Sequence, residues 1–237
     1  MTYEDQVRAE LAVWKREMTK RSGPFQRIAN TVQTKVNSLI PEKAHEIITE
    51  SIKKVVQAAL FGAEYTTKKR YEHRRTLEQI DRQVLDAVNV YKKVAAAEGA
   101  GTGAGGILLG LADFPLLLGI KMRFLFEAAS IYGFDTDLYE ERLYILHVFQ
   151  LAFSNDEHRI KMLYILEHWD ERKSELVNMD WKVFQQQYRD YIDFVKMLQL
   201  VPGIGAVVGA YANYNLLEHL GKVTMNSYRM RVLGGIV

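Results

Sequence analysis

The chain of 237 residues contains no cysteine, which excludes disulfide bonds, thiolate metal sites and cysteine nucleophiles. Proline is also scarce, with only four residues, whereas β-rich folds usually need more residues that form turns. The opening stretch, MTYEDQVRAE, is polar and charged, without the basic start and apolar core of a secretory signal or a lipoprotein cysteine. Together these absences favour a cytosolic protein and disfavour a β-rich one.

What the chain contains is typical of a folded protein, with 48% hydrophobic and 25% charged residues. Its charge is uneven. Residues 1–93 hold 18 basic and 12 acidic side chains, a net of +6, and the remainder holds 13 and 17, a net of −4. Five cations cluster between residues 68 and 75 as a candidate patch for anionic lipid, with a solvated helix start as the alternative: Lys68, Lys69, Arg70, Arg74 and Arg75. No nucleic-acid motif accompanies them, so we expect no nucleic-acid partner.

Apolar residues recur at three-and-four spacing along most of the chain, and no stretch alternates with period two. The pattern predicts an all-α fold of one domain over residues 1–237, with an amphipathic half, 1–98, and an apolar, glycine-rich half, 99–237. Thr2 and Asp5 resemble a capping box before a helix that buries Val7, Leu11, Trp14 and Met18. The remaining helices are expected at about 25–39, 47–59, 77–91, 116–131, 136–153, 155–168, 181–200 and 203–232.

Two apolar segments laced with glycine, Gly99–Ile120 and Leu198–Leu217, are the most informative feature of the chain. Glycines one helical turn apart let two helices approach closely, so Gly106, Gly110, Gly205 and Gly209 are predicted contact points. Both segments contain helix breakers or polar residues, so each is predicted to form a helical hairpin, buried or dipping into a bilayer. Aligned at an offset of 100 residues, Asp113 meets Asn213. This match indicates either a pseudo-twofold repeat or a chance likeness between biased segments.

No cofactor-binding, metal-binding or catalytic motif of the chain has the sequence context that its chemistry requires. Gly101-x-Gly103-x-x-Gly106 matches a dinucleotide fingerprint, but helical sequence precedes it where a strand is required. Glu42-x-x-His45 is half of a di-iron signature, and no second copy exists. The Gly-x-Ser-x-Gly motif of serine hydrolases is absent. The sequence therefore predicts no cofactor, no metal site and no catalytic residue.

Ionisable and amide groups within very apolar surroundings form the candidate polar core, because buried charges are costly unless they are paired. One interpretation is a pocket for a lipid headgroup or a peptide. The alternatives are a structural network, or Lys121 and Arg123 reaching the surface with their charged ends. The candidate residues are Asp113, Lys121, Arg123, Glu127, Asn213 and Arg231.

The stretches LADFPLLLGIKMRFLFEAASIYGFD at 111–135 and VPGIGAVVGAYANYNLLEHLG at 201–221 resemble the EcsC family of bacterial proteins. WKREM and IPEKAHEIITESIK, nearer the N-terminus, resemble it too. Proteins of this family are encoded beside an ABC transporter with subunits EcsA and EcsB. The resemblance therefore implies a cytoplasmic or membrane-peripheral accessory protein, with transporter subunits as expected partners. The basic patch and the apolar hairpins, taken by themselves, predict anionic lipid as a further partner and partial insertion into the membrane.

Three hypotheses follow. The first is a non-enzymatic accessory protein whose glycine-rich hairpins engage lipid or an apolar ligand. The second is a hydrolase acting on peptide or lipid, which needs a polar cluster open to solvent. The third is a soluble helical scaffold whose glycines serve packing alone.

Overall fold

A computed structural model describes residues 1–20, 42–62, 65, 75–103, 114–178 and 206–234. Within these ranges the chain is helical and contains no strand, as the all-α prediction requires. The helices are α1 (Tyr3–Thr19), α3 (Glu42–Phe61), α4 (Leu77–Gly103), α6 (Phe114–Ile131), α7 (Tyr139–Phe153), α8 (Asp156–Glu167), α9 (Trp169–Val177) and α12 (Ala206–Gly234). None of these described helices is both long and apolar enough to cross a bilayer.

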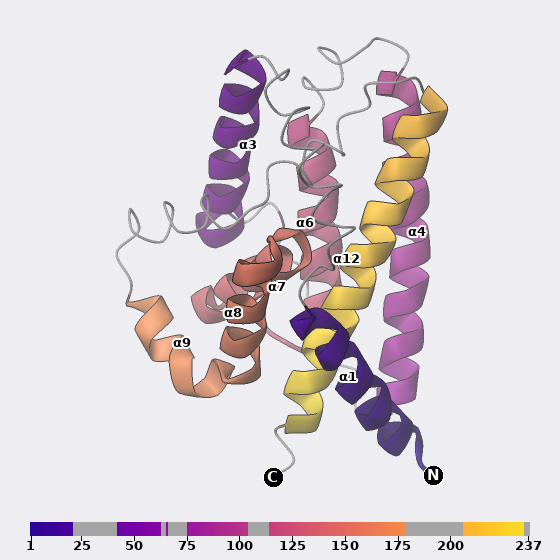
Figure 1. The fold of residues 1–237 in the computed structure, drawn as a ribbon, viewed down its shortest axis with the longest axis vertical. Coiled ribbons are helices and arrows are strands. Elements are labelled where there is room, and N and C mark those ends of the chain that lie inside the picture. The colour runs from indigo at the N-terminus through magenta and orange to yellow at the C-terminus, as the bar shows by residue number, and fades with distance from the viewer. Residues whose placement is uncertain (21–41, 63–64, 66–74, 104–113, 179–205, 235–237) are drawn as a thin grey trace.

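The two longest helices, α4 and α12, lie side by side and run in opposite directions (Figure 1). α6 packs against α4 and α3, and α7 to α9 form a smaller group beside the lower half of the bundle (Figure 1). α1 crosses the C-terminal part of α12. α6 and α7 are buried on nearly all sides, which is typical of helices at the centre of a core.

Local sequence signals explain where several helices begin and end. The Thr2 side chain accepts from the Asp5 amide and the Asp5 carboxylate accepts from the Thr2 amide, so the predicted capping box is confirmed. Thr76 and Gln79 form a reciprocal cap of the same kind before α4. Gly133 has φ +89° just after α6, a backbone conformation that glycine adopts readily and that ends the helix.

Other boundaries differ from the sequence-based expectations. α7 begins at Tyr139 rather than at about 136, and its cap is Leu138, which makes no side-chain bond. The cap of α8 is Asn155, whose side chain accepts from the amide of His158, so α8 begins at Asp156, one residue after the expected start at 155. α9 was not expected; it follows α8 after the single residue His168.

α4 continues as one helix through Gly101 and Gly103. The first two glycines of the apparent dinucleotide fingerprint therefore lie on a helix, which confirms that the strand this motif requires is not there. α4 also spans the boundary between residues 98 and 99 that separates the two predicted halves.

A different glycine marks the close approach of α4 and α12. A Cβ atom added at Gly221 would lie 2.7 Å from Cγ2 of Val88, closer than packed carbon atoms tolerate. Gly209 lies in α12, but Gly106, Gly110 and Gly205 lie outside the described residues. The prediction that these four form a contact surface therefore stays a prediction.

The helix ends next to the glycine-rich segments lie together, on one side of the bundle along its long axis (Figure 1). They are the C-terminal end of α4 and the N-terminal ends of α6 and α12. We call this the glycine-rich end and define it as residues 90–103, 114–120 and 206–217. The two hairpins and their pseudo-symmetry stay predictions, because residues 104–113 and 198–205 lie outside the described ranges.

Candidate functional site

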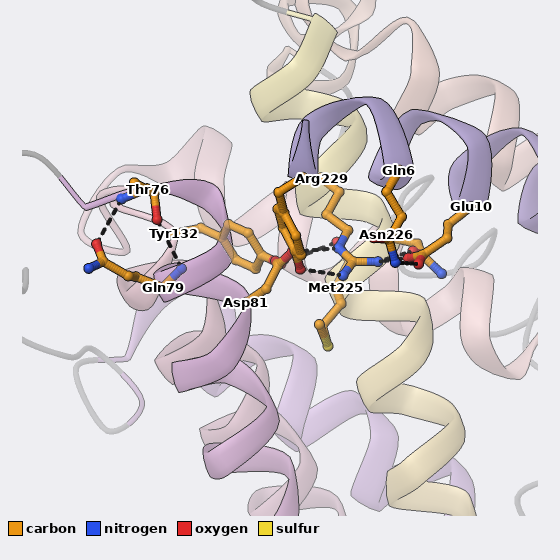
Figure 2. Close-up of polar contacts among 10 residues, drawn as sticks. Gln6, Glu10, Thr76, Gln79, Asp81, Tyr132, Met225, Asn226 and Arg229 are labelled. Carbon is orange, nitrogen blue, oxygen red and sulfur yellow. Dashed lines mark hydrogen bonds and ion pairs between the residues drawn. The ribbon is translucent and has the colours of Figure 1, made fainter. Parts of the chain in front are cut away.

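Asp81 is the centre of a buried polar network that joins four parts of the chain. Its carboxylate accepts from the hydroxyls of Tyr3 (2.8 Å) and Tyr132 (2.5 Å) and from Nε of Arg229 (2.9 Å). Asp81 lies in the second turn of α4, Arg229 near the end of α12, Tyr132 just after α6 and Tyr3 at the start of α1. Figure 2 shows Asp81 facing Arg229 across the helix pair. The network therefore ties α1 to the central bundle.

The electrostatics of this network favour a permanent ion pair. Burial alone lowers the pKa of Arg229, but Asp81, together with Tyr132 and Tyr3, outweighs burial and raises that pKa above its usual value. Burial, reinforced by Asp81, also raises the pKa of Tyr132 well above the usual range of a phenol. Tyr132 therefore stays protonated and continues to donate to Asp81.

A second network lies close by on α7 and α12. The carboxylate of Glu141 accepts from Arg231 Nη1 and from the Tyr228 hydroxyl at 2.7 Å. The guanidinium of Arg231 lies over the rings of Phe134 and Tyr144, 4.1 and 4.4 Å from their centroids. Burial raises the pKa of Glu141, and Arg231 partly offsets this effect. Because both buried acids, Asp81 and Glu141, pair with an arginine, the two networks are suited to holding helices together.

An open groove lies between α1 and α12 and shares Arg229 with the first network. Its volume is about 540 Å³, and its walls include Ala9, Val13, Trp14 and Met225. Its polar members are Gln6, Glu10, Glu17, Lys222, Asn226 and Arg229. Figure 2 shows Gln6 and Glu10 of α1 on one side of Arg229 and Asp81 on the other. The groove therefore has an apolar wall along α1 and a largely buried arginine at its base, and polar side chains form the rest of its lining.

Lys121 is fully buried on α6, between apolar neighbours of the same helix face. Its Nζ donates to the Leu117 carbonyl at 3.4 Å, a long bond to its own helix. Within the described residues no acidic side chain forms an ion pair with it. Burial therefore lowers the pKa of Lys121 to about 7, so that a large share of the amine is neutral at physiological pH.

Asn213 is fully buried on α12, at about the level of Lys121 along the bundle. Consecutive residues of α4 bond to Glu127 of α6 and Glu218 of α12, so those two glutamates share a level. Lys121 precedes Glu127 by six residues and Asn213 precedes Glu218 by five. At about 1.5 Å per residue, both side chains therefore start one to two turns nearer the glycine-rich end.

The other members of the predicted polar core lie apart from this pair. Arg123 is exposed on α6, and Glu127 accepts from the Tyr91 hydroxyl at 2.9 Å. Arg231 lies at the opposite end of α12 from Asn213, in the Glu141 network. Asp113 lies outside the described residues. The structure thus places Lys121 and Asn213 at one level, and Arg123, Glu127 and Arg231 elsewhere.

Of the predicted basic patch, only Arg75 lies among the described residues; Lys68, Lys69, Arg70 and Arg74 do not. Arg75 is half-buried, and its guanidinium donates to Gln83 and to the Ile131 carbonyl at the end of α6. A cation at a helix C-terminus is favourable because the carbonyl groups there carry partial negative charge. Arg75 therefore contacts the bundle through Nη1 and Nη2 of its guanidinium group.

The sequence did contain a signal for the networks that were missed. Asp81 falls on the apolar stripe that α4 forms with Leu77, Val84 and Val88, and an acid on such a stripe needs a buried partner. Glu141 interrupts the mostly buried α7 in the same way. Neither signal identifies the partner, because Arg229 and Arg231 are distant in the sequence.

Comparison with known proteins adds a family context. The sequence model described as the EcsC protein family matches residues 5–233. Protein EcsC of Bacillus subtilis (strain 168) is 47% identical over 233 residues, which cover 98% of both chains. Uncharacterized protein YdbA of the same organism is 25% identical over 220 residues, 83% of this chain and 80% of that protein. No solved structure matches the chain significantly.

Proposed function

Because this chain belongs to the EcsC protein family, we propose that it is a non-enzymatic accessory protein of an Ecs-type ABC transporter system. In this proposal it acts at the cytoplasmic face of the membrane and is peripheral to the bilayer. Its glycine-rich end engages lipid or an apolar ligand there. The transporter partner follows from the family resemblance, and lipid engagement from the surface of the bundle.

The observation that carries the proposal is a set of exposed apolar side chains at the glycine-rich end. Tyr211 is 70% exposed and Leu116 is 49% exposed, and Val90 and Val94 are open to solvent on α4. Tyr214 is partly exposed, with the ammonium of Lys92 4.2 Å from its ring centroid. Tyrosine beside a cation is typical of membrane–water interfaces, where one end of the ring is apolar and the other hydrated.

The described polar residues favour a binding role over hydrolysis. A hydrolase needs an acid, base or nucleophile that substrate can reach. Lys121 is fully buried, and Asp81 and Glu141 are each held by an arginine and by tyrosine hydroxyls. These groups are better suited to holding the fold together than to catalysis.

Replacing Tyr211 and Tyr214 together with serine should weaken binding to lipid vesicles. Burying an aromatic side chain contributes about 1.5–3 kcal/mol, so partial loss at two positions predicts at least a tenfold lower partition coefficient. Flotation with anionic vesicles at high salt measures this effect, because salt removes the purely electrostatic share of binding.

The matched control is Tyr164→Ser, since Tyr164 is half exposed on α8, away from the glycine-rich end (Figure 1). This variant should float like the wild type. A wild-type protein that does not float at any salt concentration would favour the soluble scaffold. Flotation unchanged by the Tyr211 and Tyr214 substitutions would place the lipid contact elsewhere.

The transporter partner is tested separately. A tagged copy of the protein, extracted from its native membranes in mild detergent, should retain the membrane subunit of the transporter through purification. Recovery of that subunit at the level of an untagged control would contradict the accessory role, whatever the vesicle result.

A further inference from the structure

We propose that the groove between α1 and α12 binds an apolar monocarboxylate, whose carboxylate takes the place of Glu10 on Arg229. This site is separate from the glycine-rich end and does not depend on lipid engagement there. The proposal rests on the volume and lining of the groove, on the two donors that hold Glu10 there and on the difference in exposure between Glu10 and Arg229.

The groove has the size and surface of a small-molecule site. Its volume of about 540 Å³ falls within the range of roughly 300–1,000 Å³ typical of ligand pockets. Ala9 and Val13 are exposed and form an apolar wall along α1, whereas Trp14 and Met225 are largely buried and contribute only a small part of their surface to the groove. Such walls suit the hydrocarbon body of a ligand better than a second charge.

Two donors of the groove, the largely buried Arg229 and the exposed Gln6 of α1, already hold a carboxylate. Nη1 of Arg229 donates to Oε2 of Glu10 at 3.2 Å, and Nε2 of Gln6 donates to Oε1 of the same group at 2.9 Å. Figure 2 shows these three side chains together beside Asn226. The two donors are thus placed to bind a carboxylate, and Glu10 of the protein itself supplies one.

Glu10 can leave this site, whereas Arg229 cannot. The side chain of Glu10 is 46% exposed on α1, and that of Arg229 is only 11% exposed. Arg229 is fixed from behind by Asp81 at 2.9 Å and by the hydroxyl of Tyr3 at 3.3 Å. The Nη1 contacts with Glu10 and with Asn226, at 3.2 and 3.4 Å, are longer than the bond to Asp81.

Exchange of Glu10 for a ligand carboxylate keeps the charge at the base of the groove unchanged. The ligand accepts from Arg229 and Gln6, and the displaced Glu10 turns into water. A cationic ligand would instead have to lie beside the guanidinium of Arg229, which like-charge repulsion disfavours. At the far end, Glu17 and Lys222 form a loose, exposed pair at 3.8 Å, which leaves a neutral environment for the tail.

The test is calorimetric titration of the full chain with decanoate below its micelle concentration, without vesicles. Glu10→Gln removes the competing internal carboxylate at an exposed position, so the dissociation constant should fall about tenfold. Val13→Asp adds a negative charge to the apolar wall and should abolish binding. Val177→Asp makes the same change on α9, outside the groove, and should bind like the wild type.

The neutral analogue 1-decanol should bind at least tenfold more weakly than decanoate and should not respond to Glu10→Gln. Equal binding of the two compounds would overturn the proposal, as would an unchanged decanoate affinity in Glu10→Gln or no binding to either protein. The Tyr211 and Tyr214 double variant should bind decanoate normally, so failure here is distinguishable from failure of vesicle binding.

Discussion

Replacing Lys121 with methionine should raise the free energy of unfolding by about 4 kcal/mol at pH 7. The lysine is fully buried, and its pKa is about 7 in the fold because burial disfavours its charged form. In the unfolded chain the pKa returns to about 10.4, so unfolding at pH 7 is driven by protonation of the released amine. Methionine has a similar unbranched shape and no proton to gain.

The pH dependence of stability has a definite sign. The unfolded chain binds more protons at Lys121 than the folded chain between pH 7 and about 10.4, so the stability of the wild type should rise with pH in this window. Between pH 7 and 9 the gain should be about 2 kcal/mol, and Lys121→Met should lack it. Urea unfolding of both proteins at the two pH values measures the difference.

Lys93→Met is the matched control, because Lys93 is an exposed lysine on α4. Its substitution should change stability by less than about 0.5 kcal/mol at either pH. Parallel pH profiles for the wild type and Lys121→Met would contradict the account, since they would mean that Lys121 keeps its charge in the folded protein.

Replacing Asp81 with alanine should lower the free energy of unfolding by about 3–5 kcal/mol. The substitution leaves the guanidinium of Arg229 largely buried, with only the half-exposed Glu10 as an acidic partner. It also removes the acceptor that serves the hydroxyls of Tyr3 and Tyr132. Buried donors without an acceptor add to the cost. Urea unfolding at pH 7 measures the loss.

Asp86→Ala provides the control on the same helix, because Asp86 is exposed, and it should stay within about 0.5 kcal/mol of the wild type. The double variant Asp81→Leu with Arg229→Met removes both charges of the pair. It should recover much of the lost stability, since apolar replacement of a whole buried ion pair is often neutral. An Asp81→Ala variant as stable as Asp86→Ala would show that this network contributes little.

Helices were predictable where short-range chemistry determines them. The capping box of Thr2 and Asp5 and the apolar stripe from Val7 to Met18 identify α1 correctly, including its buried face. The one-residue error at α8 arose because Ser154 and Asn155 are both good caps and only the folded backbone selects Asn155. α9 was missed because its nine residues are too few for a clear period.

The candidate site was predictable only in part, because its pairings are tertiary. Asp81 and Arg229 are 148 residues apart, and nothing in the local sequence links them. Lys121 was identified from its apolar surroundings, and it is indeed buried. The groove was not foreseen, because the apolar stripe of α1 predicts which face is buried and says nothing of the space left between α1 and α12.

The central claim, that the glycine-rich end contacts lipid, is tested most directly by measuring the depth of one labelled residue. The chain contains no cysteine, so Tyr211→Cys accepts a single fluorescent label, and Tyr164→Cys supplies the matched control. On anionic vesicles that contain lipids brominated along the acyl chain, the label at 211 should be quenched and the label at 164 should not. Equal quenching at both positions, or none at 211, would contradict the account.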